Sequence, residues 1–190
     1  MRLSRAAYFA DFVIYPPVIA MLLTAALRPG SPMCWKKAAI CVVGGLVLWT
    51  LIEYVAHRFV LHELPYLADM HEAHHDEPRG FVGTPTWFSL ALIGGGALLP
   101  LWWKAGLGPA SAFTAGIATG YLWYVGVHHI VHHWRIAPDT YLHRLHRRHA
   151  LHHHAPLPCN FGVTTGVWDW IFGTGFAARD RAGQRIISDA

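Results

Sequence analysis

The sequence predicts an all-α integral membrane protein, with about four transmembrane helices and a cytosolic helical cap that carries a histidine-rich dimetal site. Three observations support this prediction. Of the 190 residues, 54% are hydrophobic and only 14% are charged, whereas soluble domains have about 45–50% apolar and about 25% charged residues. Four apolar stretches approach the ~20 residues that cross a bilayer. All fifteen histidines lie between or after these stretches.

The four apolar stretches cover residues 7–27, 38–55, 87–103 and 109–127. The first contains Asp11 and the second contains Glu53, whereas the third and fourth contain no charged residue. Trp87 and Trp103, at the two ends of the third stretch, are typical of membrane interfaces. A signal peptide is the alternative for the first stretch, but no convincing cleavage pattern of small residues follows it. We therefore expect four spans.

The basic residues predict the orientation of these spans. Eleven of the fifteen Lys and Arg residues lie in the N-terminal tail, in residues 56–86 or after residue 134, and the other two connections hold four. Because basic connections stay in the cytoplasm, we expect both termini and the histidine cluster on the cytoplasmic side. No Gly-, Ser- or Pro-rich linker divides the chain, so we expect a single domain over residues 1–190. The three cysteines lack metal spacing, and we assign them no chemistry.

The histidines form four groups, in the segments HRFVLH, HEAHH, HHIVHH and HRLHRRHALHHH. A single histidine is more often an ordinary core or surface residue, but this grouping favours a metal site. Residues i, i+3 and i+4 share one face of an α-helix, and the doublet in HEAHH or HALHH reaches a second point about 100° around the helix. His57 and His62 are about 140° apart on an α-helix, so they require a break in the helix or separate positions around a cluster.

Imidazole in its neutral form binds iron, zinc, copper and nickel near pH 7. Two sites with four or five nitrogens each need roughly eight to ten histidines, and the four groups supply that number. Carboxylates are too scarce to be the main ligands, which argues against a ferritin-like centre built on glutamates. The acids near the histidines are better candidates for acceptors that hold imidazole N–H groups.

These motifs resemble those of the membrane fatty acid hydroxylase superfamily, which includes fatty acid 2-hydroxylases, sterol desaturases and carotenoid hydroxylases. The resemblance is strongest over residues 49–175. WTLIEYVAHRFVLH is similar to the first histidine box of the fatty acid 2-hydroxylase branch, HEAHH to the second, HHIVHH to the HxxxH element, and HRRHALHHH with NFGVTTGVWDWIFGT to the last box and closing segment. HHIVHH also contains the HxxxxH spacing of the carotenoid branch, but Tyr124 and the FGVTTGVWD ending agree better with the fatty acid branch.

The resemblance implies ten metal ligands, which are His57, His62, His71, His74, His75, His128, His132, His149, His152 and His153. It implies that four further residues contact the ligands without binding the metal: His129, His133, Asp169 and Tyr124. Asp169 is expected either to fix a ligand imidazole or to cap a short helix. The implied cofactors are two iron ions, with zinc as the alternative metal in purified protein, together with dioxygen and an external electron donor.

The implied function is that of a dioxygen-dependent, membrane-bound di-iron oxygenase that hydroxylates a lipid C–H bond, in a fatty acyl chain. Hydroxylation of a sterol or carotenoid, and desaturation, begin with the same hydrogen abstraction and stay open as alternatives. We expect the lipid to arrive from the membrane and the electrons to come from a separate ferredoxin- or cytochrome-type protein, because no cytochrome domain is fused to the chain. Val125 stands beside Tyr124 where several hydroxylases have an acid. No nucleic acid partner is expected.

Three other functions compete with the oxygenase. A metal transporter or store would also use many histidines, but transporters usually place ionisable ligands within their spans, and these spans contain few. A structural membrane protein could bind anionic lipid through a basic, histidine-rich tail, without enzymatic activity. A dizinc hydrolase uses similar ligands and is distinguished by its independence from dioxygen.

Overall fold

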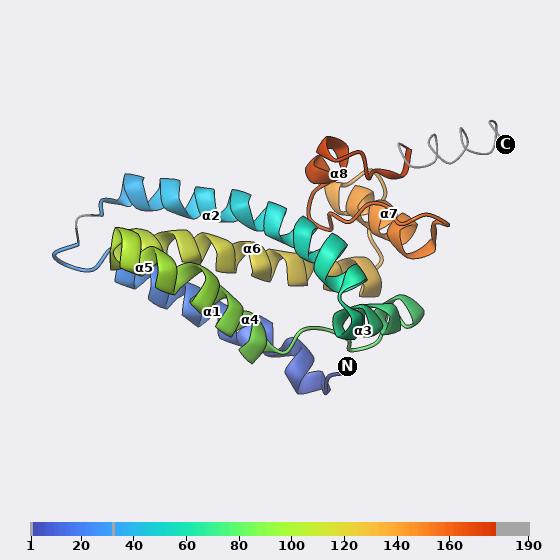
Figure 1. Cartoon of the computed structure of the whole chain (residues 1–190), viewed down its shortest axis with the longest axis horizontal. Coiled ribbons are helices and arrows are strands. Elements are labelled where there is room, and N and C mark those ends of the chain that lie inside the picture. Colours follow the sequence, from blue (N-terminus) through green and yellow to red (C-terminus); the bar gives the residue numbers. More distant parts are fainter. Residues whose placement is uncertain (1, 32, 178–190) are drawn as a thin grey trace. The chain divides into compact units, whose positions relative to one another are not determined.

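The regular structure is helical throughout residues 2–31 and 33–177, the part of the chain that the computed structural model describes (Figure 1). One isolated antiparallel bridge, between Arg2 and Val82, accompanies the helices. The predicted all-α class is therefore confirmed. In chain order, with η for π-helical segments, the elements are α1 (Arg5–Ala26), α2 (Trp35–Val55), η1 (Ala56–Leu61), α3 (Pro65–Asp76), α4 (Thr86–Ile93), η2 (Gly94–Leu98), α5 (Leu99–Ala105), α6 (Leu107–His133), α7 (Tyr141–His154) and α8 (Val167–Ile171).

The elements belong to two compact units. The span unit comprises Met1–Trp49 and Gly80–Val125, and the histidine unit comprises Thr50–Arg79 and Gly126–Ala190. Helices α2 and α6 contribute residues to both units. Each unit is described below by itself.

Aromatic and small residues form the core of the span unit. Tyr15, Ala118 and Tyr121 are buried together, and Trp49 packs against them. The two tyrosine hydroxyls are satisfied within this core, because Tyr15 donates to Ser89 and Tyr121 donates to Asp11, each at 2.8 Å. A polar group buried among apolar helices costs free energy unless it is hydrogen-bonded. These bonds therefore connect α1 with α4 and with α6 at little cost.

Glycines allow α2 and α6 to approach each other closely within the span unit. A Cβ atom added to Gly45 would lie 2.1 Å from the carbonyl oxygen of Phe113, and one added to Gly116 would lie 2.1 Å from that of Val42. No side chain fits at such distances. Small residues of this kind let helix backbones pack tightly inside membranes.

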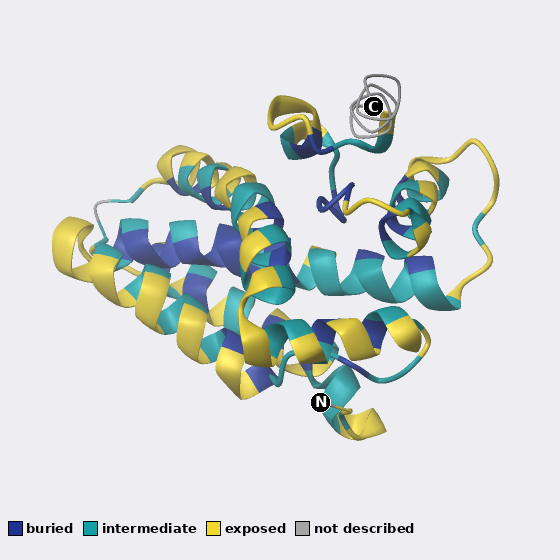
Figure 2. Cartoon of the chain, turned by 45° about the vertical axis from the view of Figure 1, so that its right-hand side comes forward, coloured by how far each residue is buried: buried dark blue, intermediate teal, exposed yellow. Residues whose placement is uncertain are grey.

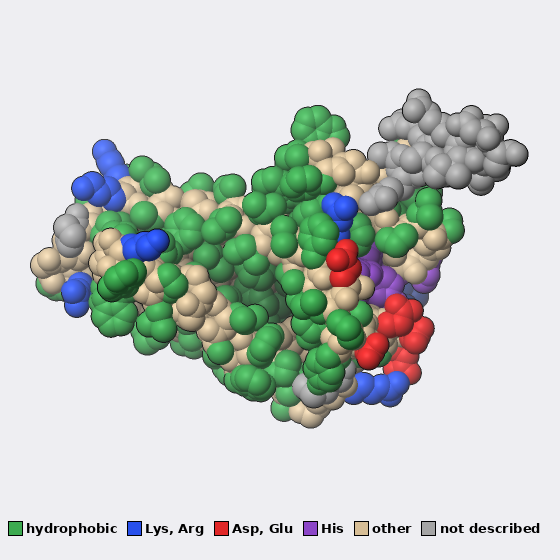
Figure 3. Space-filling view, viewed as in Figure 1, with side chains coloured by type: hydrophobic (Ala, Val, Ile, Leu, Met, Phe, Trp, Pro, Cys, Tyr) green, Lys and Arg blue, Asp and Glu red, His purple; other side chains and the backbone are tan. Residues whose placement is uncertain are grey.

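Among the described residues, three helical stretches have the length and hydropathy to cross a membrane: Arg5–Ala26, Trp35–Leu61 and Thr86–Ala105. They correspond to the first three expected spans, the first of which ends one residue earlier than expected, at Ala26. Large apolar side chains such as Val13, Ile40 and Trp103 are exposed on them. Figure 3 shows hydrophobic side chains over much of this surface. Such exposure fits contact with lipid rather than water. The chain is thus an integral membrane protein with about three membrane-capable helices.

The fourth expected span lies in α6, which differs from the other three. Its residues 110–121 are mostly buried within the span unit (Figure 2), and many of them are alanine, glycine, serine or threonine. Such residues lower the hydropathy of a helix while they favour close packing. Protein neighbours, rather than exposed apolar side chains, therefore surround this part of α6.

In the histidine unit, proline and a capping threonine mark the ends of the helices that carry the histidines. Pro65 lies in the first turn of α3, where the missing N–H of proline costs nothing. Thr140 caps α7, and its Oγ1 accepts a hydrogen bond from the His143 N–H at 3.1 Å. Helix α7 ends at His154, before Pro156. Local sequence signals thus mark the start of α3 and both ends of α7.

Candidate metal centre

The predicted ligands lie in the histidine unit on η1 and the residue after it, α3, the end of α6, and α7. On α3, the Nε2 atoms of His71 and His75 lie 3.1 Å apart. On α7, the Nε2 atoms of His149 and His153 also lie 3.1 Å apart. Both pairs have the i, i+4 spacing that places side chains on one face of a helix. The two HxxHH motifs therefore direct their rings as their spacing predicts.

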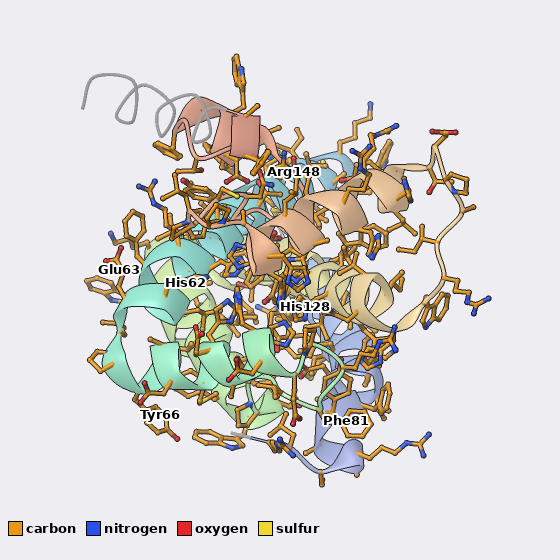
Figure 4. All side chains as sticks on the ribbon, turned by 90° about the vertical axis from the view of Figure 1, so that its right-hand side faces the viewer. His62, Glu63, Tyr66, Phe81, His128 and Arg148 are labelled. Carbon is orange, nitrogen blue, oxygen red and sulfur yellow. The ribbon has the colours of Figure 1, made fainter. Side chains whose placement is uncertain are left out.

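Eight of the ten predicted ligands gather in two groups, in each of which one ring nitrogen per residue lies within 4.8 Å of the others. Figure 4 labels His62, a member of the first group, and His128, which borders the second. Group 1 consists of His57, His62, His71 and His152, and group 2 consists of His74, His132, His149 and His153.

The spacing within each group fits a metal ion. In group 1, Nε2 of His57 lies 3.0 Å from Nε2 of His71. In group 2, Nε2 of His132 lies 2.8 Å from Nε2 of His149. Ligands of a tetrahedral metal with bonds of about 2.1 Å are separated by about 3.4 Å. The residues present therefore fit one metal ion in each group, with Nε2 as the ligand atom of these four rings.

The other two predicted ligands lie beside the groups. The ring of His75 stacks on that of His153 with centroids 4.2 Å apart, and it lies 4.7 Å from that of His71. It thus touches both groups. The ring of His128 lies 4.6 Å from that of His74 and 4.7 Å from that of His132, so it borders group 2.

The four residues predicted to contact the ligands lie in surroundings that differ from one residue to the next. His129 and His133 stack on each other with centroids 4.5 Å apart, and neither belongs to group 1 or group 2. Tyr124 packs in the span unit against the core that contains Tyr121. The carboxylate of Asp169 accepts hydrogen bonds from backbone amides, from Thr174 and from Arg148. Its contacts in the described chain thus include no imidazole.

Burial keeps the grouped imidazoles neutral. Loss of hydration is the main cause that lowers the pKa of His62 and His74 to about 4 and that of His152 to about 3. The same cause lowers the pKa of His149, and neighbouring histidines lower it further. Near pH 7 these rings therefore carry a free lone pair, the form in which imidazole binds a metal.

The π-helical segment η1 explains how His57 and His62 reach the same group. Five residues separate them, and an α-helix would point them apart. In η1 the hydrogen bonds run over five residues instead of four. The ring centroids of His57 and His62 lie 5.2 Å apart, and both residues belong to group 1. The irregularity that the spacing requires thus takes the form of a π-helical turn.

Two backbone carbonyls fix the orientation of group 1. Nδ1 of His57 lies 2.5 Å from the carbonyl oxygen of Phe161, and Nδ1 of His152 lies 2.8 Å from that of Cys159. A carbonyl oxygen only accepts, so both rings donate their Nδ1 proton and leave Nε2 unprotonated. Partners of this kind set the tautomer of metal-binding histidines.

Our sequence interpretation missed one residue of this arrangement. The carboxylate of Glu53 is buried and accepts hydrogen bonds from the amides of Val163 and Thr164, at 2.7 and 2.8 Å, in the same closing segment. A signal for it was present, because Glu53 lies in an apolar stretch, four residues before His57. An ionisable residue in such a stretch marks a functional site by default.

Comparisons with known proteins agree with the geometry. The family model described as "Fatty acid hydroxylase" matches residues 42–174. The chain is 30% identical to a dihydroceramide fatty acyl 2-hydroxylase of Arabidopsis thaliana, over 90% of this chain and 75% of the relative. It is 31% identical to the ceramide very long chain fatty acid hydroxylase of Saccharomyces cerevisiae, over 90% of this chain and 46% of the relative. Human fatty acid 2-hydroxylase is 32% identical over 68% of this chain and 38% of its own length.

A solved structure has the same fold. It is described as full-length scs7p with only the hydroxylase domain visible, and it superposes with a TM-score of 0.78 at 27% identity. The match covers 90% of this chain and 67% of that structure. The chain spans less than half of the yeast and human relatives and three quarters of the plant relative. Together with the family match over most of the chain, these similarities show that the protein belongs to the fatty acid hydroxylase family.

Proposed function

We propose that the protein is a dimetal oxygenase that hydroxylates a C–H bond of a membrane lipid. The observation that carries this proposal is the pair of four-histidine groups, each with its ring nitrogens within 4.8 Å of one another. A diffuse histidine-rich binder needs no such convergence. The ten histidines predicted as ligands are proposed to hold the metals, with the eight grouped residues as the main ligands and His75 and His128 completing them.

Iron is the proposed metal, and when bound it would supply the reduction of dioxygen and the abstraction of hydrogen from the lipid. The protein would supply neutral imidazoles in fixed directions. His57 and His152 are oriented by backbone carbonyls. Helices α3 and α7 each supply ligands to both groups, so the spacing between the two metals would depend on how these helices pack.

The proposed substrate is an acyl chain, hydroxylated at the carbon next to the carbonyl. The names of the plant and yeast relatives indicate fatty acyl 2-hydroxylation and hydroxylation of ceramide fatty acids. We infer that this chain acts on the same class of lipid. Its membrane-capable helices lie in the environment where such a lipid dissolves.

We further propose four spans, with α6 as the fourth and with both termini and the histidine groups in the cytoplasm. The support is the distribution of basic residues, eleven against four. Three of the eleven, Arg179, Arg181 and Arg185, lie outside the described residues. On this proposal residues 1–190 act as a single domain.

Hydroxylation consumes dioxygen, two electrons and two protons, and it yields the alcohol and water. The proposed electron source is a separate ferredoxin- or cytochrome-type protein. A cytoplasmic histidine unit would be accessible to such a donor.

The experiment that tests this function uses purified protein loaded with iron. Given a ceramide or acyl lipid, a ferredoxin or cytochrome with its reductase, and ¹⁸O-labelled dioxygen, the protein should produce 2-hydroxyacyl lipid that contains one ¹⁸O atom. Mass spectrometry detects the product and the position of its hydroxyl group. Without the donor no product should form. A product with oxygen from water, or turnover without dioxygen, would contradict the oxygenase and favour a dizinc hydrolase.

A further inference from the structure

The closing segment, residues 159–164, connects the metal centre with two buried carboxylates. Its carbonyl groups at Cys159 and Phe161 accept the Nδ1 protons of His152 and His57. Both histidines belong to group 1. Any shift of this segment would therefore move the acceptors that set the direction and the tautomer of two group 1 rings.

Two carboxylates hold four successive amides of the closing segment. Asp169 accepts from the N–H groups of Phe161 and Gly162, both at 2.9 Å. Glu53 accepts from the N–H groups of Val163 and Thr164. Oε2 of Glu53 also accepts the hydroxyl of Thr164, at 2.6 Å. The four residues are buried, so their amides would lack an acceptor without these bonds, which therefore restrain the segment.

Glu53 links the segment directly to a ligand-bearing helix. It lies on α2, four residues before His57, so the two residues share one helix face. The helix therefore supplies both a group 1 ligand and the carboxylate that holds the acceptor of that ligand. The exposed fraction of Glu53 is 3% and that of His57 is 2%.

We propose that Glu53 is a positioning residue that selectively secures the metal of group 1. This inference rests on the proposed function for the identity of the metal. Glu53 acts through the closing segment on His57 and His152. Group 2 is held differently, since Nδ1 of His149 and of His153 is buried and bonds no group in the described part of the chain. Loss of Glu53 should therefore affect group 1 first.

The hydrogen-bond pattern predicts which substitutions are tolerated. In Glu53→Gln, the amide oxygen can still accept both backbone N–H groups, and its NH₂ can donate to the Thr164 hydroxyl, which both donates and accepts. In Glu53→Ala, the two amides lose their acceptor. Asp169→Asn differs from Glu53→Gln, because each oxygen of Asp169 faces an N–H that can only donate, from Phe161 on one side and from Gly162 and Arg148 on the other. Either orientation of the new amide would set N–H against N–H.

The test measures metal, not turnover. Full-length wild type, Glu53→Ala, Glu53→Gln, Asp169→Asn and Thr50→Val are loaded with ⁵⁷Fe(II) and dialysed against a weak chelator. Iron per chain and the Mössbauer signals of the two positions are then recorded. Thr50→Val is the matched control, because Thr50 lies one turn before Glu53 on α2 and its Oγ1 accepts from Nε1 of Trp168 in α8, at 2.9 Å and outside residues 159–164.

In Glu53→Ala and Asp169→Asn, affinity at one position should fall about 10–100-fold, as for other partners that orient metal ligands. One of the two iron signals should then disappear and the other should remain. Glu53→Gln and Thr50→Val should keep both signals. If Glu53→Ala does not fold, Asp169→Asn tests whether the closing segment secures group 1, and a loss of metal in Glu53→Gln would contradict the role assigned to Glu53.

Three results would overturn the proposal: wild-type iron binding in folded Glu53→Ala, equal loss from both positions, or a loss in Glu53→Gln as large as in Glu53→Ala. Failure of the proposed function looks different. Wild-type protein would then bind metal at both positions but form no hydroxylated lipid, and the comparison among variants would still decide the role of Glu53.

Discussion

At the scale of single residues, position in the fold separates histidines that look alike in the sequence. His74 is buried between His128 and His132, with ring centroids 4.6 and 4.7 Å away. His143, on the first turn of α7, belongs to neither metal group. The same residue type thus serves as a candidate ligand in one place and as an ordinary helix residue in another.

This difference predicts unequal effects of alanine substitution. His74→Ala should lower the metal affinity of group 2 by more than the roughly 10–100-fold that follows loss of an orienting partner, because it removes a ligand atom itself. His143→Ala should bind metal as the wild type does. Metal content after dialysis, measured by mass spectrometry, checks both. Similar losses in the two variants would argue for a diffuse histidine-rich binder.

The surroundings of Gly162 also leave no room for a side chain. An added Cβ would lie 2.0 Å from the carbonyl oxygen of Thr165 and 3.1 Å from Oδ2 of Asp169. Gly162→Ala should therefore lower the free energy of unfolding by about 1–3 kcal/mol, as overpacking usually does. Gly175→Ala is the control, because no atom lies within 4 Å of its added Cβ. Thermal unfolding in detergent compares them, and equal midpoints would refute the packing argument.

At the scale of elements, the crossing of α2 and α6 depends on one of two adjacent glycines. The Cβ of Gly45→Ala would clash with backbone atoms of α6, whereas that of Gly44→Ala would approach only the ring of Phe113, at 3.3 Å. A ring can move more easily than a helix backbone. We expect Gly45→Ala to cost about 1–3 kcal/mol or more and Gly44→Ala much less. Unfolding midpoints in detergent measure the difference, and a reversed order would show that the helices do not cross at Gly45.

The π-helical segment η1 brings His57 and His62 into one metal group, which a regular α-helix would not do. Its neighbours α2 and α3 are regular α-helices, but HRFVLH must place two rings in one metal group. Single π-helical turns are rare and frequently lie at functional sites. The irregularity here coincides with the first histidine box.

At the scale of the whole molecule, the proposed topology predicts where reporters become accessible. Fusions at Gly30 and Gly106 should behave as external, because they lie in the connections on the side with fewer basic residues. A fusion after Asp189, a position outside the described residues, should behave as cytoplasmic. An external C-terminus together with an external Gly30 would contradict the four-span arrangement.

The proposed electron donor should bind through exposed basic residues of α7. Arg144 and Arg147 are exposed, whereas Arg148 pairs with the buried Asp169 at 2.8 Å and is less available to a partner. Replacing Arg144 and Arg147 with Glu should raise the KM for an acidic donor and weaken the salt dependence of turnover, since salt screens such attraction over about 10 Å at 0.1 M. Steady-state kinetics with varied donor measures both. Iron content should not change, and an unaltered KM would place the docking surface elsewhere.

The membrane class, the helical class and the histidine-rich motifs can be predicted from the amino-acid sequence alone. Apolar runs of about 20 residues and i, i+4 histidine spacings are local properties, because they depend only on helix geometry and on transfer from water to lipid. The resemblance to the hydroxylase superfamily was carried by the same local motifs, and the family comparisons confirm it.

Only the tertiary structure decided how the histidines divide between two groups and what holds them. Group 1 joins His57 with His152, and Glu53 reaches Val163, across separations of about a hundred residues that no local pattern encodes. Asp169 also turned out to contact amides rather than an imidazole. Hydrogen bonds to backbone carbonyls and amides leave no trace in residue type, because every residue has a carbonyl and nearly every residue has an N–H. The packing of the chain alone determines which of these groups meet the ligands.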